Sequence, residues 1–174
     1  DFKVYAKARE KLLNMIDEKV FIQDKSPWLY IYQLSSKNLI QKGIVACTSI
    51  DDYQNNVIKK HEHTLPIKEQ DRADHINYVG AHTGPVLMTY RENPKITQIT
   101  DDWISNHIPV YDFYSNDGVG QAVWVVDNKI IIKEIVDLFA QVKALYIADG
   151  HHRAAAATKV GMAKRAKNPN YSAD

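Results

Sequence analysis

The sequence predicts an α+β fold in which helices flank a mixed β-sheet. Apolar residues recur at helical spacing in some segments, whereas short β-branched and aromatic runs mark strands in others. Helices and strands alternate along the chain, but some neighbouring strands are close enough in sequence to form hairpins. This mixture favours a mixed sheet over a doubly wound parallel sheet.

The periodicity also gives the order of the elements. In the first half we expect a helix over residues 3–18, followed by strands over 28–34 and 42–48 that are joined by a polar turn at 35–38. We then expect a short helix with Asp51 as its N-cap, which carries Tyr53, Val57 and Ile58. A further helix is expected over about 69–79. In the second half we expect strands over 86–90, 110–114, 121–126 and 144–148, and helices over 99–106, 129–142 and 154–166.

Length and charge restrict the class of protein. The chain has 174 residues, of which 45% are hydrophobic and 25% charged, as in a globular domain. The formal net charge is +1, which argues against DNA or an acidic membrane surface as a partner. No apolar run reaches the length of a membrane span. Cys47 is the single cysteine, and it is expected to be a buried thiol in a cytoplasmic, reducing compartment.

We expect residues 1–174 to form a single domain that is incomplete at both ends. Asp1 is not an initiator methionine, and it is followed almost at once by a helical pattern. Residues 168–174 are mostly turn-forming. Both features indicate a piece of a longer protein, and the oligomeric state stays open.

The most specific stretch is an apolar strand that ends at Asp149 and Gly150 and continues into a helix beginning near His151, His152 and Arg153. The first N–H groups of a helix lack intrahelical partners and carry the positive end of its dipole. Gly150 lets the backbone approach a ligand closely, and Arg153 can hold an oxyanion with two donors. Arg153 is positively charged, and His151 and His152 can become so. Positive charge at a helix N-terminus is unfavourable to the helix dipole unless an anion binds there. The stretch predicts a phosphate or carboxylate site; the alternative is a capped helix whose histidines bond local carbonyls.

A second polar cluster covers residues 59–72. His61 and His63 would share one face of an extended segment, with Glu62 on the other. Three interpretations stay open: a solvated charged segment, a zinc site completed by a histidine of the first cluster, and a loop that reaches the anion site. In the loop interpretation Glu62 and His61 lie near the anion, Glu62 suits a general base, and Arg72 contacts phosphate.

Several of these motifs together resemble one protein family. They are residues 51–53, 58–64, 68–72, 82–86 and 147–153. Their likeness extends along nearly the whole chain and is to the bacterial and archaeal family known as domain of unknown function 1015. Members of that family are longer than this chain, and the family itself implies no activity.

The strand–Gly–x–x–Arg–helix element is also similar to the nucleotide-binding fold of ParB and sulfiredoxin proteins. Sulfiredoxins have the loop Gly-Cys-His-Arg, so Gly150, His152 and Arg153 match its glycine and its two phosphate-binding residues. His151 stands where the reactive cysteine would be, which excludes sulfinic-acid repair. ParB partition proteins have Gly-x-Arg-Arg, so His152 replaces the first arginine, and no helix-turn-helix is recognisable. The free-serine kinases of this fold have a loop similar to Asp149-Gly150-His151 and use an acidic general base.

The resemblance and the residues lead to one expected function, phosphoryl transfer by a kinase from a nucleotide (ATP, ADP or CTP) to a small hydroxylated metabolite. The residues expected to hold the nucleotide are Asp149, Gly150, His151, His152 and Arg153. Glu62 is expected to take the hydroxyl proton, with His61 and Arg72 beside the transferred group, and Mg²⁺ to bridge the phosphates with Asp149 or Asp71. The alternatives are a nucleotide-binding switch without significant turnover and a hydrolase with a histidine-bound metal.

Overall fold

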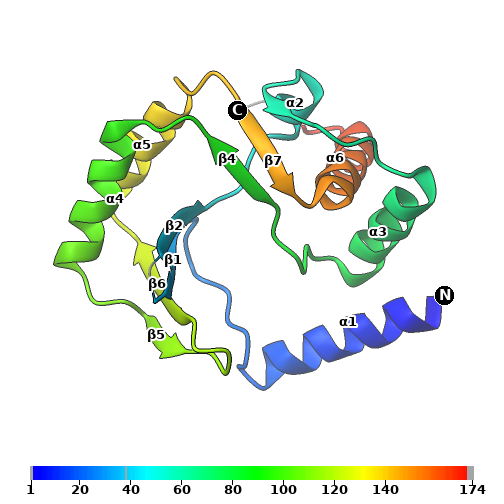
Figure 1. Ribbon diagram of the computed structural model, residues 1–174. Helices are drawn as coiled ribbons and strands as arrows, with labels where there is room; N and C mark the ends of the chain where they lie inside the picture. The colour runs from blue at the N-terminus through cyan, green and yellow to red at the C-terminus, as the bar shows by residue number, and fades with distance from the viewer. Residues whose placement is uncertain (1, 38, 172–174) are drawn as a thin grey trace. The chain divides into compact units, whose positions relative to one another are not determined.

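The computed structural model describes residues 2–37 and 39–171 and has an α+β architecture with two sheets and flanking helices (Figure 1). The elements in chain order are α1 (Phe2–Asp17), β1 (Leu29–Ser36), β2 (Leu39–Val45), α2 (Ile50–Gln54), β3 (Ile58–Lys59), α3 (Pro66–Val79), β4 (Leu87–Tyr90), α4 (Pro94–Asn106), β5 (Tyr111–Tyr114), β6 (Gly120–Val126), α5 (Lys129–Phe139), β7 (Leu145–Asp149) and α6 (His151–Ala166).

These elements form two compact units, each assembled from separate stretches of the chain. The first comprises Asp1–Gln23, Thr48–Tyr90 and Ala144–Asp174, and the second comprises Asp24–Cys47 and Arg91–Lys143. Neither unit is continuous in sequence, and each contains one of the two sheets. The expected single domain over residues 1–174 stays a prediction.

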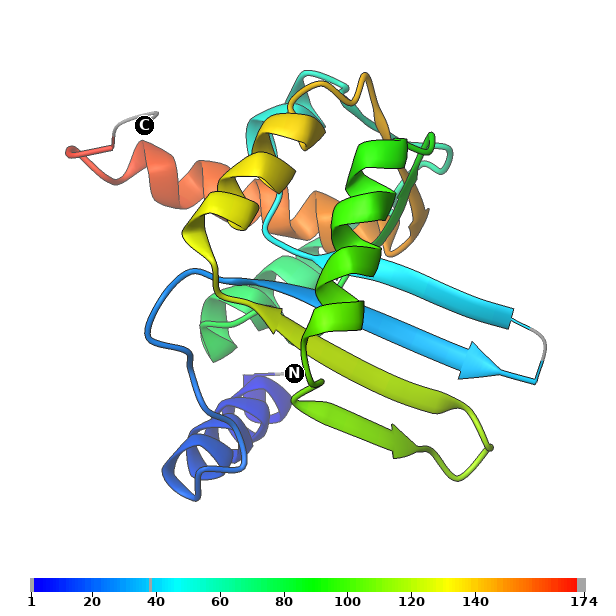
Figure 2. The same cartoon turned by 90° about the vertical axis from the view of Figure 1, so that its left-hand side faces the viewer.

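The second unit contains a four-stranded antiparallel sheet in the order β2-β1-β6-β5. Alternate residues of β6 are buried, as expected for a strand with one covered face. Ile31, Trp124 and Val126 of the sheet form a core with Trp103 of α4 and Ile135 of α5. Figure 2 shows α4 and α5 lying over the same face of this sheet.

The first unit contains a three-stranded sheet in the order β3-β7-β4. The central strand β7 pairs in parallel with β3 and antiparallel with β4, so this smaller sheet is the mixed one. On the helical side α6 packs closely against α3, because small residues occupy the contact. Ala73 of α3 and Ala156 of α6 are both buried there, beside Ile76 and Val160.

Several boundaries differ from those expected. The helices α3 and α4 begin at Pro66 and Pro94, earlier than predicted, since proline is well suited to the first helical position. Ser49, and not Asp51, caps α2 by accepting the Asp51 N–H at 3.1 Å. Ile58 belongs to β3 and not to a helix.

The expected burial of the cysteine is also wrong. Cys47 is exposed and follows the end of β2 at Val45, so it is not part of the strand. The predicted turn between β1 and β2 reached to Asn38, which lies outside the described residues, as do Asp1 and residues 172–174.

An ion pair connects α2 to the C-terminal part of α6. Arg165 donates from Nη1 to Oδ1 of Asp51 at 2.6 Å and from Nη2 to Oδ2 at 3.0 Å. These hydrogen bonds lower the pKa of Asp51 from its ordinary value of 3.8 and raise that of Arg165. A lowered carboxyl pKa stabilises the fold above the unfolded-state value, and this stabilisation is lost as the pH falls through the folded-state value.

Asp51→Asn is therefore expected to lower the melting temperature at pH 7, because it removes one partner of the Arg165 pair. The difference from the unchanged protein should shrink once the pH falls below 3.8, because the unfolded chain then takes up a proton at Asp51 more readily than the folded protein does. Thermal unfolding monitored by circular dichroism at pH 7 and pH 3 measures both effects. Asp52→Asn, in the same helical turn, is the control. A difference that persists unchanged at pH 3 would contradict the assignment.

Candidate functional site

The candidate site is built around the Gly150 turn, residues 149–153, where β7 passes directly into α6. Gly150 has φ 97° and ψ 31°, a left-handed conformation that favours glycine, and no side chain caps the helix. The first helical hydrogen bond runs from the Ala154 N–H to the Gly150 carbonyl at 2.9 Å. Within the described residues the preceding N–H groups, of His151, His152 and Arg153, have no acceptor. The turn therefore presents free donors at the positive end of a helix dipole.

Arg153 folds back over this turn and lies close to the glycine. A Cβ added at Gly150 would be 3.0 Å from Nε and Nη2 of Arg153. Nη2 donates to Oδ2 of Asp149 at 2.5 Å, and Nη1 donates to the Pro85 carbonyl. A Cβ at Gly84 would also meet the guanidinium, at 3.3 Å, so two glycines leave space for it. Arg153 is thus at the helix N-terminus, with its donors held by a carboxylate and a carbonyl.

His151 is the most deeply buried polar side chain of the turn, with 4% of its surface exposed. Its Nε2 accepts a long hydrogen bond from the His61 N–H at 3.5 Å, and its Nδ1 lies 3.5 Å from Oε2 of Glu62. The His61 ring meets the His151 ring edge-on, at 4.3 Å between centroids. Because Nε2 accepts an N–H, we assign the ring proton to Nδ1, which faces the Glu62 carboxylate.

His152 also accepts a hydrogen bond from a backbone N–H, that of Leu65, which lies four residues after His61 in the sequence. Its Nε2 accepts a hydrogen bond from the Leu65 N–H at 3.1 Å. In this geometry the Nε2 atom of each histidine accepts a backbone N–H. Because both rings are engaged with backbone donors, the case for an anion rests on the free N–H groups and Arg153.

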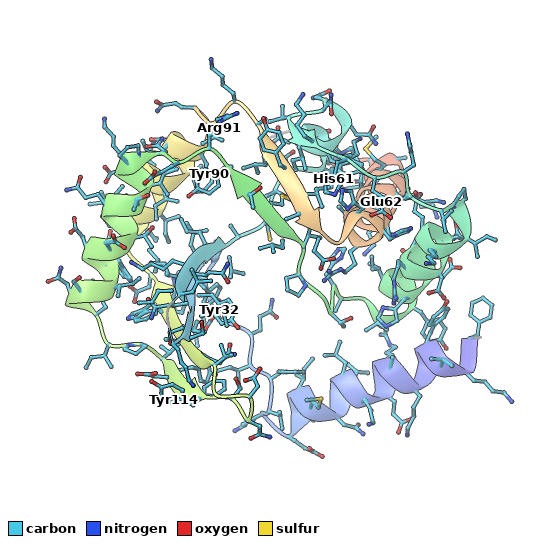
Figure 3. All side chains as sticks on the ribbon, viewed as in Figure 1. Tyr32, His61, Glu62, Tyr90, Arg91 and Tyr114 are labelled. Carbon is cyan, nitrogen blue, oxygen red and sulfur yellow. The ribbon has the colours of Figure 1, made fainter. Side chains whose placement is uncertain are left out.

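Glu62 and His61 are thus brought to the Gly150 turn from about 90 residues away in sequence. Figure 3 shows both side chains beside the N-terminal end of α6. The Glu62 side chain is 56% exposed, so its carboxylate is open to a ligand as well as to His151.

The other acid and guanidinium expected here lie on α3. Asp71 accepts a hydrogen bond from the hydroxyl of Tyr5 on α1, and this bond raises the pKa of Tyr5. The nearby charge of Arg72 opposes that shift. Among the described residues no contact connects Arg72 or Asp71 with the Gly150 turn. A phosphate contact from Arg72 stays a prediction.

Two partners in the site were missed because they are backbone groups. The Leu65 N–H and the Pro85 carbonyl carry no signal in side-chain chemistry. The one available hint was the run Thr83-Gly84-Pro85 before a strand. That strand, β4, pairs with β7, and its Leu87 lies opposite Asp149, which brings the preceding residues to the turn.

The metal-site interpretation has no support from the arrangement of donors. In the part of the chain that the structure describes, no three or more His, Cys, Asp or Glu side chains form a group that could hold a metal ion. His63 is exposed, and no contact joins it to the histidines of the turn within the same residues.

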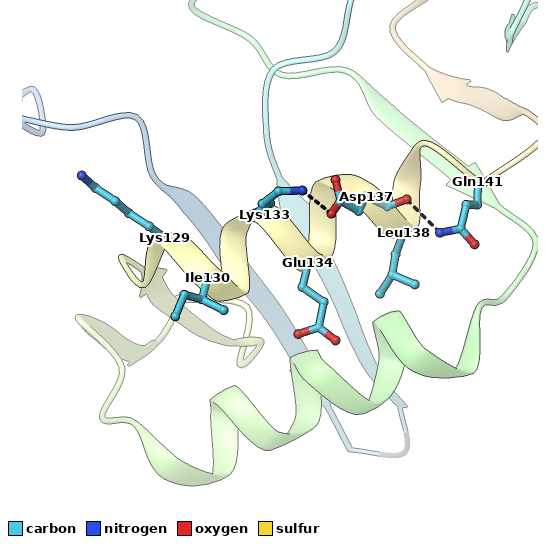
Figure 4. Close-up of a pocket in the computed structure, with 7 residues that line it drawn as sticks. All are labelled: Lys129, Ile130, Lys133, Glu134, Asp137, Leu138 and Gln141. Atoms are coloured by element: carbon cyan, nitrogen blue, oxygen red, sulfur yellow. Dashed lines mark hydrogen bonds and ion pairs between the residues drawn. The ribbon is translucent and has the colours of Figure 1, made fainter.

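A hollow in the second unit follows the surface of α5 (Figure 4). Its charged side chains include Lys133 and Asp137, which pair with each other at 2.5 Å one helical turn apart. Such a pair is typical of an exposed helix face, and it leaves neither group directed at a ligand. The candidate site is therefore placed at the Gly150 turn and not in this hollow.

Comparison with known proteins identifies a family but no relative of known activity. The family model described as Protein of unknown function (DUF1015) matches residues 1–174. No curated protein matches the chain, and no solved structure matches it. None of the helices in the described residues is both long and apolar enough to cross a membrane.

Gly150→Ala is expected to destabilise the protein more than an ordinary glycine-to-alanine change at positive φ. The left-handed conformation costs about 1–2 kcal/mol for an L-residue, and the new Cβ would also displace the Arg153 guanidinium. Gly118→Ala is the matched control, because Gly118 has φ 79° but no neighbour within 4 Å of a Cβ. Urea unfolding of both variants gives the comparison. Equal losses in unfolding free energy would show that Arg153 does not pack on the glycine.

Proposed function

The chain belongs to the family described as Protein of unknown function (DUF1015), and we propose that it binds the phosphates of a nucleotide and transfers a phosphoryl group to a small hydroxylated metabolite. That description names no activity, so the proposal depends on the site. The observation that carries it is that the Glu62 carboxylate lies beside a helix N-terminus with free N–H groups and an arginine.

The free N–H groups of the Gly150 turn and the Arg153 guanidinium are the groups assigned to phosphate. Anions bind readily at helix N-termini, where N–H donors and the dipole act together. The carboxylate that pairs with Arg153 is that of Asp149, whose side chain is 72% exposed. Exposed ion pairs contribute little to stability, so a phosphate can replace that carboxylate at small cost.

Glu62 is the group assigned to proton removal. In the proposed step the acceptor hydroxyl oxygen bonds to the terminal phosphorus, and the bond from that phosphorus to the bridging oxygen breaks. The electron pair of the broken bond stays on the shortened nucleotide, and the hydroxyl proton moves to Glu62. The His151 Nδ1–H faces the same carboxylate and orients it without removing its exposed side from solvent.

Mg²⁺ is the cation expected with a nucleotide, and the residues of the turn fit it in part. Magnesium is held by one or two carboxylates together with substrate phosphates, and Asp149 supplies one exposed carboxylate at the turn. Asp71 lies on α3, where its carboxylate accepts the Tyr5 hydroxyl, and no contact among the described residues joins it to the turn. When bound, the ion supplies neutralisation of the phosphate charge.

The likeness to the ParB and sulfiredoxin fold remains part of this proposal only. It depends on the match of Gly150, His152 and Arg153 to a loop motif, and no solved structure matches the chain. A nucleotide switch would use the same phosphate contacts, so turnover is the measurement that separates it from a kinase.

Arg153→Ala is expected to weaken nucleotide binding about ten- to a hundredfold, as for the loss of a charge-assisted contact. Calorimetry with ATP, ADP and CTP in the presence of Mg²⁺ measures the affinity. Arg91→Ala, at an exposed arginine of the second unit, is the control. Unchanged affinity in Arg153→Ala would remove the proposed phosphate site.

Glu62→Gln is expected to retain nucleotide affinity and to lose about 10²–10⁴-fold in turnover, because the amide cannot take up the proton. The assay follows nucleotide consumption with a panel of hydroxylated amino acids and polyols. Glu18→Gln, at an exposed carboxylate, controls for the change of charge. Full turnover in Glu62→Gln would exclude it as the base, and binding without any turnover in the unchanged protein would favour the switch.

A further inference from the structure

We infer that His152, together with His151, is a positioning residue that holds the Glu62 segment on the N-terminus of α6 by accepting backbone N–H groups. The segment concerned is residues 61–65. As far as turnover is concerned, the inference rests on the proposed function, but the hydrogen bonds themselves can be tested without it. This role differs from the direct phosphate contact expected for the two histidines from the sequence.

The contacts bracket Glu62 on both sides. The His61 N–H reaches Nε2 of His151 at 3.5 Å, and the Leu65 N–H reaches Nε2 of His152 at 3.1 Å. Residues 61–65 form neither helix nor strand, and they connect the two-residue strand β3 to α3. A segment without regular structure depends on such contacts for its position. The histidine pair therefore determines where the Glu62 backbone lies relative to the turn.

Leu65 is also the residue that precedes α3. It is the N-cap of that helix, and its side chain makes no capping hydrogen bond. Thr64 donates to Glu69 in the first turn of α3 at 3.0 Å, and Glu69 lies 3.6 Å from Lys159 of α6. Both the Glu69–Lys159 contact and the Leu65–His152 hydrogen bond therefore connect α6 to the start of α3.

An acceptor role requires an unprotonated nitrogen. A protonated imidazole has two N–H donors and no acceptor, so it would face the Leu65 N–H with another N–H. The inference therefore predicts that protonation of His152 releases the C-terminal end of the segment. The segment would then hold Glu62 less firmly as the pH falls.

His152 is the histidine whose protonation would release the segment, because the charged groups around the two histidines are engaged with other partners. On the segment, Glu62 and the His61 ring face His151, and Oε2 of Glu62 lies 3.5 Å from its Nδ1. On α6, Arg153 is paired with Asp149. On α3, the carboxylate of Glu69 is directed to Thr64 and Lys159. Among the described residues, the one hydrogen bond of the half-buried His152 ring is the Leu65 contact.

The first experiment uses the ligand-free, full-length protein labelled with ¹⁵N and follows the Leu65 amide and the His152 ring by NMR as the pH is lowered. We expect both signals to change with the same midpoint. In His152→Gln, whose side-chain oxygen is an acceptor that does not titrate, the change at Leu65 should disappear. His63→Gln, in the same segment, should leave it in place. A Leu65 amide signal that does not change while the His152 ring titrates would overturn the inference.

The second experiment compares nucleotide affinity with turnover in His152→Leu and His152→Gln. Loss of positioning should lower kcat in His152→Leu by about 10²-fold, as for a small displacement of a catalytic group, while nucleotide affinity stays within about twofold. His152→Gln should recover part of that loss and show a weaker acid limb in its pH–rate profile. A fall in nucleotide affinity with kcat unchanged would instead assign His152 to phosphate and overturn the inference.

The two experiments separate failure of the inference from failure of the proposed function. If the Leu65 amide follows His152 but no nucleotide binds or turns over, the positioning role stands and the proposed function fails. If His152→Leu does not fold, the NMR titration of His152→Gln still decides between the two assignments.

Discussion

The left-handed backbone at Gly150 is the constraint on which the candidate site depends. It lets β7 enter α6 without an intervening loop, so the chain leaves a buried strand and at once exposes a helix N-terminus. Because no side chain caps that end, its donors stay available, and because glycine has no Cβ, Arg153 can lie against it. A residue with a side chain at this position would strain the turn and meet the Arg153 guanidinium.

Much of the fold follows from periodicity in the sequence. The strongly patterned elements, such as α1, β1 and β6, appear close to where the apolar spacing predicts them. The errors fall where local patterns are weak. β3 has only two residues and exists because Ile58 pairs with β7, and polar residues at the starts of α3 and α4 hid helices that begin at proline. Tertiary pairing decides such cases, and it cannot be read from a short window.

The site was predictable to a similar degree and for similar reasons. Glu62 and His61 lie in one motif and His151 and Arg153 in the other, and each motif alone lacks part of the chemistry. This division predicted that the two motifs meet, and they do. The backbone partners of His151 and His152 were not predictable. These partners are N–H groups of residues distant in sequence, and backbone donors are the same for every residue type except proline.

The close packing of α3 on α6 carries a consequence for how this protein tolerates variation. Ala73 and Ala156 let the two helices approach, and α3 begins directly after Leu65, whose N–H bonds His152. A larger side chain at Ala156 would push α3 outward and carry the Leu65 amide with it. In a mutational scan scored by activity, substitutions at this buried alanine would therefore have the same effect as substitutions at Glu62, although Ala156 contacts no ligand.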